Sequence, residues 1–171
     1  MLPIHDVLQT LKAALEVGNT AVLAAPPGAG KTTVMLGLLR CLAEDGVAVQ
    51  PYKCGPDYID PGFHRLASGH DSVNLDAYAM QPSTILRLAG QGDGLLAVEG
   101  AMGLFDGAAN GRGSAAALAQ MLGLPVILVV DCARQAQSVA ALVRVVPDSA
   151  ADKGPGDGTG SVTGPRAATD R

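Results

Sequence analysis

The sequence TAVLAAPPGAGKTT, at residues 20–33, passes from an apolar run into a loop rich in proline and glycine. An apolar run with β-branched residues that ends in such a loop is typical of a buried strand. The following residues, KTTVMLGLLRCLAED, repeat apolar side chains at helical spacing and stop at Gly46, a residue that favours a left-handed helix cap. We therefore predict a strand at 20–25 and a helix from Lys31 to about Asp45.

Three more apolar runs predict strands, at 47–52, 94–100 and 125–131. Helices are expected at 114–122, with Ser114 as the N-cap, and at 134–146. Strands that alternate with crossover helices indicate an α/β fold with a doubly wound, mostly parallel sheet. Ligands of such a sheet bind at the carboxyl ends of its strands.

Two segments flank this domain, which is predicted to span residues 20–146. Residues 1–19 carry apolar side chains at a spacing that predicts an amphipathic helix. Residues 147–171 are rich in glycine and proline and show no periodicity, which predicts a disordered tail.

Composition limits the partners of the chain. A length of 171 residues suits one domain, and a net charge of −4 without a basic block argues against nucleic acid or an anionic membrane surface. No apolar run approaches the length of a membrane span. The three cysteines lie far apart, which argues against a zinc site or a disulfide scaffold and favours a reducing, cytoplasmic location. We expect a small-molecule ligand.

Residues 25–32 fit the phosphate-binding pattern G-x-x-x-x-G-K-[ST], with Ala25 in the place of the first glycine. Glycines let the backbone approach closely, so that its N–H groups and the start of the helix face phosphate oxygens. The lysine would reach the β- and γ-phosphates of ATP, and the threonine hydroxyl would bind Mg²⁺. The predicted ATP-binding residues are Pro27, Gly28, Ala29, Gly30, Lys31, Thr32 and Thr33.

Acidic residues follow the predicted strands. Glu99 closes the strand at 94–100 and Asp106 follows it, while Asp57 and Asp60 lie in an irregular loop, GPDYIDPGFH. Each of these acids alone is compatible with a solvated turn residue. Gathered beside a phosphate-binding loop, they would repel one another unless a cation, Mg²⁺ or the Lys31 ammonium, lay among them. The pattern therefore favours Mg²⁺, which prefers oxygen ligands.

Four stretches carry a family resemblance: KCGPDYIDPGFH, NLDAYAM, VEGAMGLFDG and DCARQAQSVAALV. On these, residues 20–145 resemble the N-terminal synthetase domain of the cobyrinic or hydrogenobyrinic acid a,c-diamide synthases, with GPDYIDPGFH the most specific part. Related P-loop enzymes include dethiobiotin synthetase. The resemblance implies a P-loop NTPase-like fold and a glutamine-dependent amidoligase of cobalamin biosynthesis.

In that family, ATP would phosphorylate the a- and c-acetate carboxylates of a corrinoid, and ammonia would displace phosphate from each acyl phosphate. The resemblance implies roles for matching residues: the lysine and threonine of the P-loop bind the γ-phosphate and Mg²⁺, and acids complete the metal shell or contact substrate or intermediate. The implied metal ligands are Thr32, Asp57 and Glu99, and the implied catalytic residues are Lys31, Asp60 and Asp106.

The chain departs from the family in three respects. Its phosphate loop is about one residue shorter than the form A-P-x-S-G-x-G-K-T, and an extra helix precedes the first strand. We expect the glutaminase domain of the family to be missing from this chain, because no cysteine lies in a glycine-flanked elbow with a later histidine to activate it. We therefore expect a truncated domain, through a frameshift or as a fragment, that takes ammonia from a missing or separate glutaminase.

Other interpretations stay open. A P-loop fragment could bind nucleotide without synthetase activity, and residues 1–33 also resemble the start of DEAH-type RNA helicases, although D-E-x-H is absent. The sequence does not distinguish cobyrinate from hydrogenobyrinate, and it is compatible with a homodimer. His64 is expected to contact substrate or cap a loop, and Lys53 and Arg112 to be solvated or to meet substrate carboxylates. Cys54 and Cys132 are expected to be packed rather than reactive.

Overall fold

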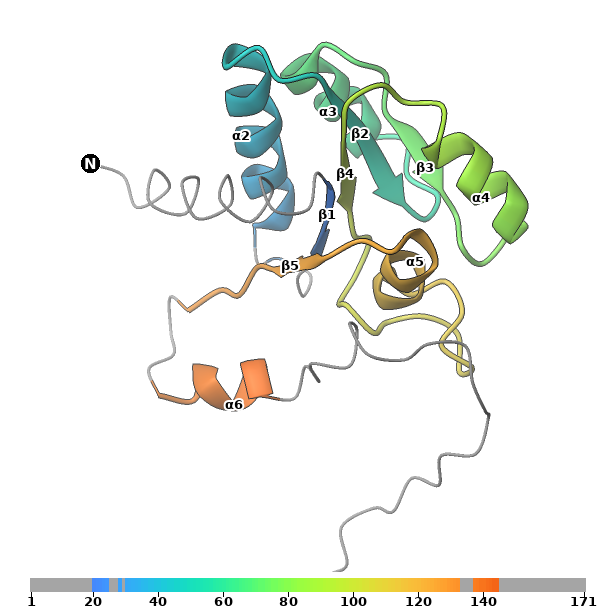
Figure 1. Ribbon diagram of the computed structural model, residues 1–171. Coiled ribbons are helices and arrows are strands. Elements are labelled where there is room, and N and C mark those ends of the chain that lie inside the picture. The colour runs from blue at the N-terminus through green and yellow to red at the C-terminus, as the bar shows by residue number, and fades with distance from the viewer. Residues whose placement is uncertain (1–19, 25–27, 29, 133–136, 145–171) are drawn as a thin grey trace, which may run out of the picture.

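The computed structural model describes residues 20–24, 28, 30–132 and 137–144. Within them, five parallel strands form one sheet in the order β3-β2-β4-β1-β5 (Figure 1). The strands are β1 (Thr20–Ala24), β2 (Val49–Cys54), β3 (Val73–Leu75), β4 (Leu95–Glu99) and β5 (Val126–Leu128). The helices are α2 (Lys31–Glu44), α3 (Asp60–Ser68), α4 (Pro82–Ala89), α5 (Ala115–Leu122) and α6 (Val139–Arg144).

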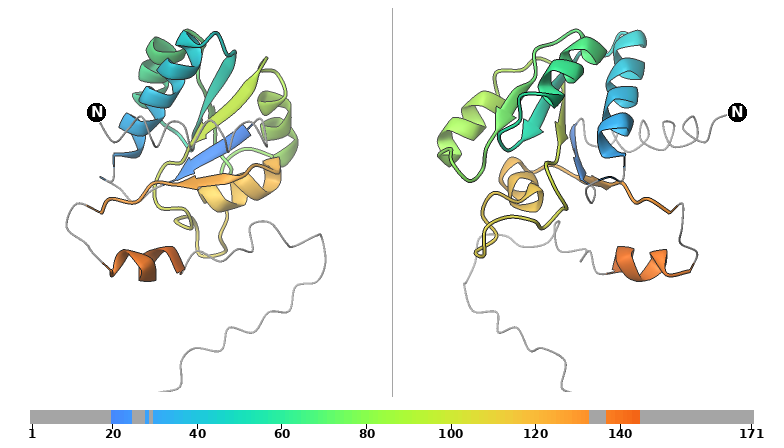
Figure 2. Two further views of the ribbon diagram at one scale, coloured as in Figure 1. Left: turned by 60° about the vertical axis from the view of Figure 1, so that its left-hand side comes forward. Right: turned by 180° about the vertical axis from the view of Figure 1, so that it is seen from behind.

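Helices cover both faces of the sheet (Figure 2). One face packs against α2, whose apolar side chains at positions 35, 38, 39 and 42 form a core cluster with Val49 and Ala97. The opposite face carries the larger cluster, in which Ile85 of α4 and Leu118 of α5 lie against Tyr52 and Val98. Pro51 of β2 pairs with Ala97 of β4 in the sheet. Because side chains alternate along a strand, Lys53 and Glu99, two positions further on, also face α2 and α3.

The strand order brings the predicted site residues close together. Strand β4 lies between β1, which leads into the phosphate loop, and β2, which leads into the loop with the two aspartates. In the β2–β4 register, Lys53 is the partner of Glu99. Since all strands are parallel, their carboxyl ends lie at one edge of the sheet, and this edge holds the site.

The predicted fold class, an α/β protein with a doubly wound parallel sheet, is confirmed. Four predicted strands are present, and a fifth, β3, has only three residues, too few for an alternating pattern to be recognised. The loop predicted at 55–64 is in part helical, because α3 begins at Asp60 with Pro61 in its first turn, where proline is favoured. Helix α4 also begins at a proline and was not predicted.

The predicted N-terminal helix at 1–19 and the tail at 147–171 lie outside the described residues. Of the helix predicted at 134–146, residues 139–144 are described as α6. Among the described helices, none is both long and apolar enough to cross a membrane.

Candidate functional site

Glu99 is the centre of the site. It is the last residue of β4, and its side chain is fully buried. A buried carboxylate is stable only when hydrogen bonds and opposite charge replace its lost hydration. The structure supplies three partners: Thr32 Oγ1 donates to Oε1 at 2.6 Å, Lys53 Nζ lies 3.1 Å from the same oxygen, and His64 Nε2 lies 2.7 Å from Oε2.

Lys53 joins this carboxylate to the two aspartates that follow β2. Its Nζ lies 2.5 Å from Oδ2 of Asp60 and 3.7 Å from Oδ2 of Asp57, in addition to its contact with Glu99. The lysine is 2% exposed, so the prediction of a solvated cation is wrong for this structure. The Lys53 ammonium therefore offsets part of the negative charge of these three acids.

The pKa values of Glu99 and Lys53 agree with a charged state for both groups. Burial raises the pKa of the Glu99 carboxyl, but hydrogen bonds from His64 and Thr32 and the charge of Lys53 outweigh it and hold this pKa below its ordinary value. Burial lowers the pKa of the Lys53 ammonium, but its hydrogen bond to Asp60 and the charge of Glu99 raise it overall. The pair is therefore ionic at neutral pH.

Asp57 shapes the start of α3. Its Oδ1 accepts hydrogen bonds from the backbone N–H groups of Ile59 at 2.8 Å and Asp60 at 3.0 Å, an Asx-type turn. Burial raises the pKa of Asp57, but these two N–H groups and the charge of Lys53 lower it overall. Asn74, the middle residue of β3, donates from Nδ2 to the Asp57 carbonyl at 2.6 Å. This turn sets the direction of Asp60 toward Lys53.

The phosphate loop meets the site through Thr32, in the first turn of α2. Gly28 and Gly30 have φ angles of +81° and +77°, a left-handed backbone that favours glycine. Lys31 is 9% exposed, and no ion pair joins it to another described residue. Thr33 is exposed, whereas the predicted phosphate ligands Pro27 and Ala29 lie outside the described residues.

His64 is fully buried, which differs from the predicted contact with substrate or loop cap. Besides its contact with Glu99, its Nδ1 lies 3.1 Å from the hydroxyl oxygen of Ser72. The sequence carries no local signal for this role, because the two contacts depend on how α3 packs over the sheet beside α2.

Asp106 stays apart from this cluster in the described structure. It is exposed, and its Oδ2 accepts a hydrogen bond from the Gly103 N–H at 2.9 Å within its own loop. No ion pair or hydrogen bond joins Asp106 to the other predicted acids among the described residues. Its predicted catalytic role is therefore not supported by a contact here.

The oxygens of Thr32 and Glu99 suit Mg²⁺, a hard cation that prefers oxygen ligands and keeps several waters. Among the described residues, no group of three or more His, Cys, Asp or Glu side chains could hold a metal ion. Of the predicted metal ligands, Thr32 and Glu99 touch, while Asp57 is connected to Glu99 only through Lys53. The donor set fits a metal held by few protein oxygens together with phosphate.

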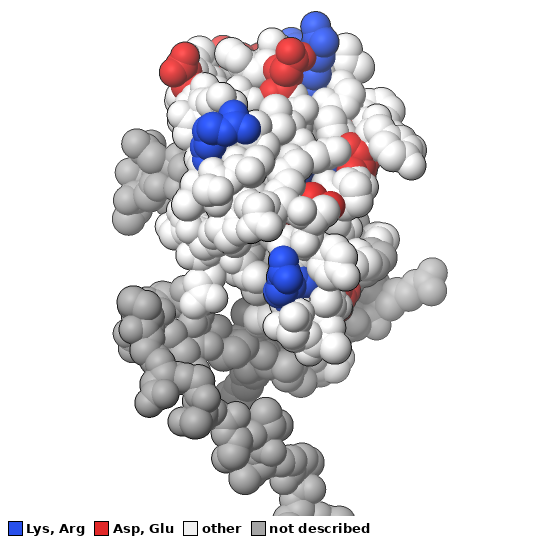
Figure 3. Space-filling view, turned by 90° about the vertical axis from the view of Figure 1, so that its right-hand side faces the viewer, with Lys and Arg blue, Asp and Glu red and all other residues white. Residues whose placement is uncertain are grey.

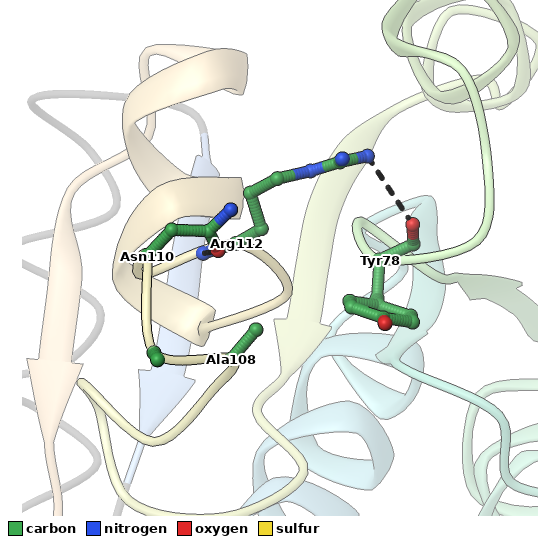
Figure 4. Close-up of a pocket in the computed structure, with 5 residues that line it drawn as sticks. Tyr78, Ala108, Asn110 and Arg112 are labelled. Atoms are coloured by element: carbon green, nitrogen blue, oxygen red, sulfur yellow. Dashed lines mark hydrogen bonds between the residues drawn. The ribbon is translucent and has the colours of Figure 1, made fainter.

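A hollow of about 520 Å³ lies beside the loop that follows β4, lined by Tyr78, Ala108, Ala109, Asn110 and Arg112. The Arg112 guanidinium extends toward the loop after β3, where it donates to the Tyr78 carbonyl at 3.4 Å (Figure 4). On the face drawn in Figure 3, the basic side chains of the described residues are scattered among acidic and uncharged ones.

Comparison with known proteins identifies a family model and relatives that match this chain. Residues 21–153 match the family model described as the CobQ/CobB/MinD/ParA nucleotide binding domain. The chain is 58% identical over 127 residues to hydrogenobyrinate a,c-diamide synthase of Brucella anthropi, which covers 71% of this chain and 29% of that protein. Proteins of the same name from a Sinorhizobium species and Rhodobacter capsulatus are 56% and 53% identical, over 74% and 71% of this chain and 30% and 29% of their own lengths. The chain thus spans less than one third of the length of these relatives.

Proposed function

The chain belongs to the CobQ/CobB/MinD/ParA nucleotide-binding family, and we propose that it acts as the ATP-dependent synthetase part of a hydrogenobyrinate a,c-diamide synthase. The reaction is the activation of the a- and c-acetate carboxylates of the corrinoid as acyl phosphates, followed by amidation. The observation that carries this proposal is the 2.6 Å contact between Thr32 and Glu99. This contact supports the proposal because it joins the helix that follows the predicted phosphate loop to a buried cluster of acids and a lysine.

Each part of the site has a role in this proposal. Gly28, Gly30 and Lys31 bind the phosphates of ATP through backbone N–H groups and one ammonium. Thr32 and Glu99 would hold Mg²⁺, which when bound supplies positive charge to the transferring phosphoryl group. Lys53 keeps the carboxylates of Asp60 and Glu99 close together without mutual repulsion. Such chemistry depends chiefly on positioning and charge neutralisation.

The substrate and the source of ammonia follow from the relatives. Their shared name favours hydrogenobyrinate over cobyrinate. The chain spans about three tenths of their length, and we propose that the ammonia for amidation derives from glutamine. Arg112, exposed and without an acidic partner among the described residues, is a candidate for a substrate carboxylate. We assign the protein to the cytoplasm, with the corrinoid as its small-molecule partner.

A second candidate is a nucleotide-binding protein without synthetase activity. The observation that favours it is the position of Asp106, a predicted catalytic acid, which is exposed and bonds to Gly103 within its own loop. Under this alternative, the phosphate loop and Glu99 bind Mg²⁺ and ATP, but no carboxylate is activated.

The two are separated by incubating the full chain with ATP, Mg²⁺, hydrogenobyrinate and ammonium at high concentration. The synthetase predicts ADP release and corrinoid products whose mass shows one and two carboxyl groups converted to amides. A parallel reaction with cobyrinate tests the substrate preference, and Lys31→Ala is the inactive control. If ATP binds but no amide forms, the nucleotide-binding alternative replaces the proposal.

A further inference from the structure

The two oxygens of Glu99 have different surroundings. Oε1 faces the phosphate loop, where it accepts from Thr32, and it also contacts Lys53. Oε2 points away from these groups and lies 2.7 Å from His64 Nε2. A carboxylate can rotate about its last bond, so a partner on Oε2 determines where Oε1 points.

The histidine that holds Oε2 is itself held on every side that the structure describes. Its ring is fully buried. Its backbone carbonyl accepts from the Ser68 hydroxyl at 2.8 Å, within the same helix, α3. Its second ring nitrogen, Nδ1, lies 3.1 Å from the Ser72 hydroxyl oxygen, in the segment between α3 and β3.

Donor and acceptor roles follow from the chemistry of the groups. An ionised carboxylate only accepts hydrogen bonds, so His64 Nε2 carries the proton that points to Glu99. In the neutral ring, Nδ1 is then an acceptor, and the Ser72 hydroxyl donates to it. The contacts form a directed chain, from the Ser72 hydroxyl through the His64 ring to Glu99 Oε2.

We propose that His64 is a positioning residue, which holds Glu99 Oε2 so that Oε1 stays directed at Thr32, and that the Ser72 hydroxyl, by donating to Nδ1, fixes the orientation of the ring. Outer partners that orient a metal-binding group commonly change metal affinity by about 10- to 100-fold when removed. The inference rests on the proposed function only in taking Thr32 and Glu99 as the residues that hold the metal of the nucleotide complex.

A purely space-filling histidine would not show this arrangement. Both ring nitrogens have polar partners, and the hydrogen bond to Glu99 is short for a nitrogen donor, as expected when the acceptor is charged. Replacement by an apolar residue of similar size would fill the space but release Oε2. Replacement by glutamine would retain an amide N–H that can reach the same oxygen.

The first test measures binding of Mn²⁺ to the full chain in the presence of ADP, by electron paramagnetic resonance. His64→Leu should weaken Mn²⁺ binding by about tenfold or more, and His64→Gln should restore most of it. His70→Leu is the matched control, because this exposed histidine lies nearby in sequence and makes no side-chain contact with Glu99. Unchanged binding in a folded His64→Leu variant, or equal losses in the leucine and glutamine variants, would overturn the inference.

The second test needs neither metal nor a folded leucine variant. Nitrogen NMR of the His64 ring should show the proton on Nε2 in the wild-type chain, and the Nδ1 resonance should shift in Ser72→Ala because its hydrogen bond is lost. A wild-type ring protonated on Nδ1 would contradict the proposal. So would a Ser72→Ala variant whose Nδ1 resonance is the same as in the wild-type chain.

These outcomes are separate from those of the proposed function. If metal and nucleotide bind but no corrinoid is amidated, the synthetase proposal fails and the role of His64 stands. If amidation occurs and His64→Leu binds Mn²⁺ as the wild-type chain does, the role of His64 fails and the synthetase proposal stands.

Discussion

Lys53 is the residue whose role differs most from its appearance in the sequence. It looks like one lysine before a loop, yet its ammonium is buried among three carboxylates. Removing one member of a buried ion pair leaves the other charge without compensation, and this penalty exceeds the value of the pair itself. The lysine therefore contributes strongly to the stability of the acidic site.

At this residue we predict a large loss of stability. Lys53→Met should lower the free energy of unfolding by about 3–5 kcal/mol, because Asp60 and Glu99 lose their common cation. Arg40→Met is the matched control: Arg40 pairs with Glu44 on the exposed face of α2, and its loss should cost less than about 1 kcal/mol. Urea unfolding of both variants measures the difference. Equal effects would show that the buried cluster does not depend on Lys53.

We predict that the free energy of unfolding falls in acid, because of Glu99 and Asp57. Both carboxyl groups have a pKa below the ordinary value in the folded chain. The unfolded chain then binds more protons as the pH falls through the unfolded values, about 4 for these groups, so stability declines below that pH. Lys53, with a raised pKa, contributes stability below about 10.4 that is lost as the pH rises through its folded pKa.

The measurement is the free energy of unfolding by denaturant between pH 7 and pH 3. Glu99→Gln should be less stable at pH 7 and should show a shallower decline in acid than the wild-type chain. A decline of the same steepness in Glu99→Gln would mean that this carboxyl does not have a lowered pKa in the folded state.

At the scale of elements, α3 connects the aspartate loop to the centre of the site. The helix begins at Asp60, which contacts Lys53, and one turn later presents His64 to Glu99. Pro61 favours the first turn, and the left-handed Gly69 ends the helix. The position of two site residues therefore depends on where this short helix starts.

We predict that the Asx-type turn at Asp57 fixes this start. Asp57→Ala removes the acceptor of two backbone N–H groups and should cost on the order of 1 kcal/mol, whereas Asp57→Asn keeps the acceptor and should cost less. Asp71→Ala, which removes an exposed partner of Arg65 after the same helix, is the control. The measurement is urea unfolding. Equal losses in the alanine and asparagine variants would indicate a role of charge and not of the turn.

At the scale of the whole molecule, the sheet order builds the site from distant parts of the chain. Because β4 lies between β1 and β2, Glu99 is placed between the phosphate loop and Lys53. The site faces α2 and α3, while the larger apolar cluster lies on the other face, under α4 and α5. Nucleotide binding at the sheet edge should therefore stabilise the fold as one unit.

We predict that Mg²⁺ and ATP raise the melting temperature of the full chain. A ligand at about 100 times its Kd adds about 2.7 kcal/mol to the stability of a protein that binds it only when folded. Lys31→Ala should lose this increase but keep most of the stability of the free chain, because no ion pair joins Lys31 to a described residue. An increase of the same size in Lys31→Ala would refute its role in phosphate binding. Differential scanning fluorimetry with and without EDTA provides the comparison.

Local patterns in the sequence were sufficient for the main features of the fold and part of the site. The apolar run at 20–25 and the helical spacing after Lys31 predicted the first strand and helix, because both depend on side chains close in sequence. Glu99 and the aspartates were recognised because an acid that follows an apolar run can be identified from the sequence alone. Short elements were missed: β3 has too few residues for a period, and α3 and α4 begin at prolines that also suggest loops.

The sequence by itself therefore determined the phosphate loop, the alternation of strands and helices, and the presence of acids at strand ends. Only the tertiary structure decided the partners of those acids. Lys53 meets Glu99 because β2 and β4 are neighbours in one register, and His64 reaches Glu99 across 35 residues because α3 packs over the sheet. The physical reason is burial, because a carboxylate removed from water must find its cation and donors in space, wherever they lie along the chain.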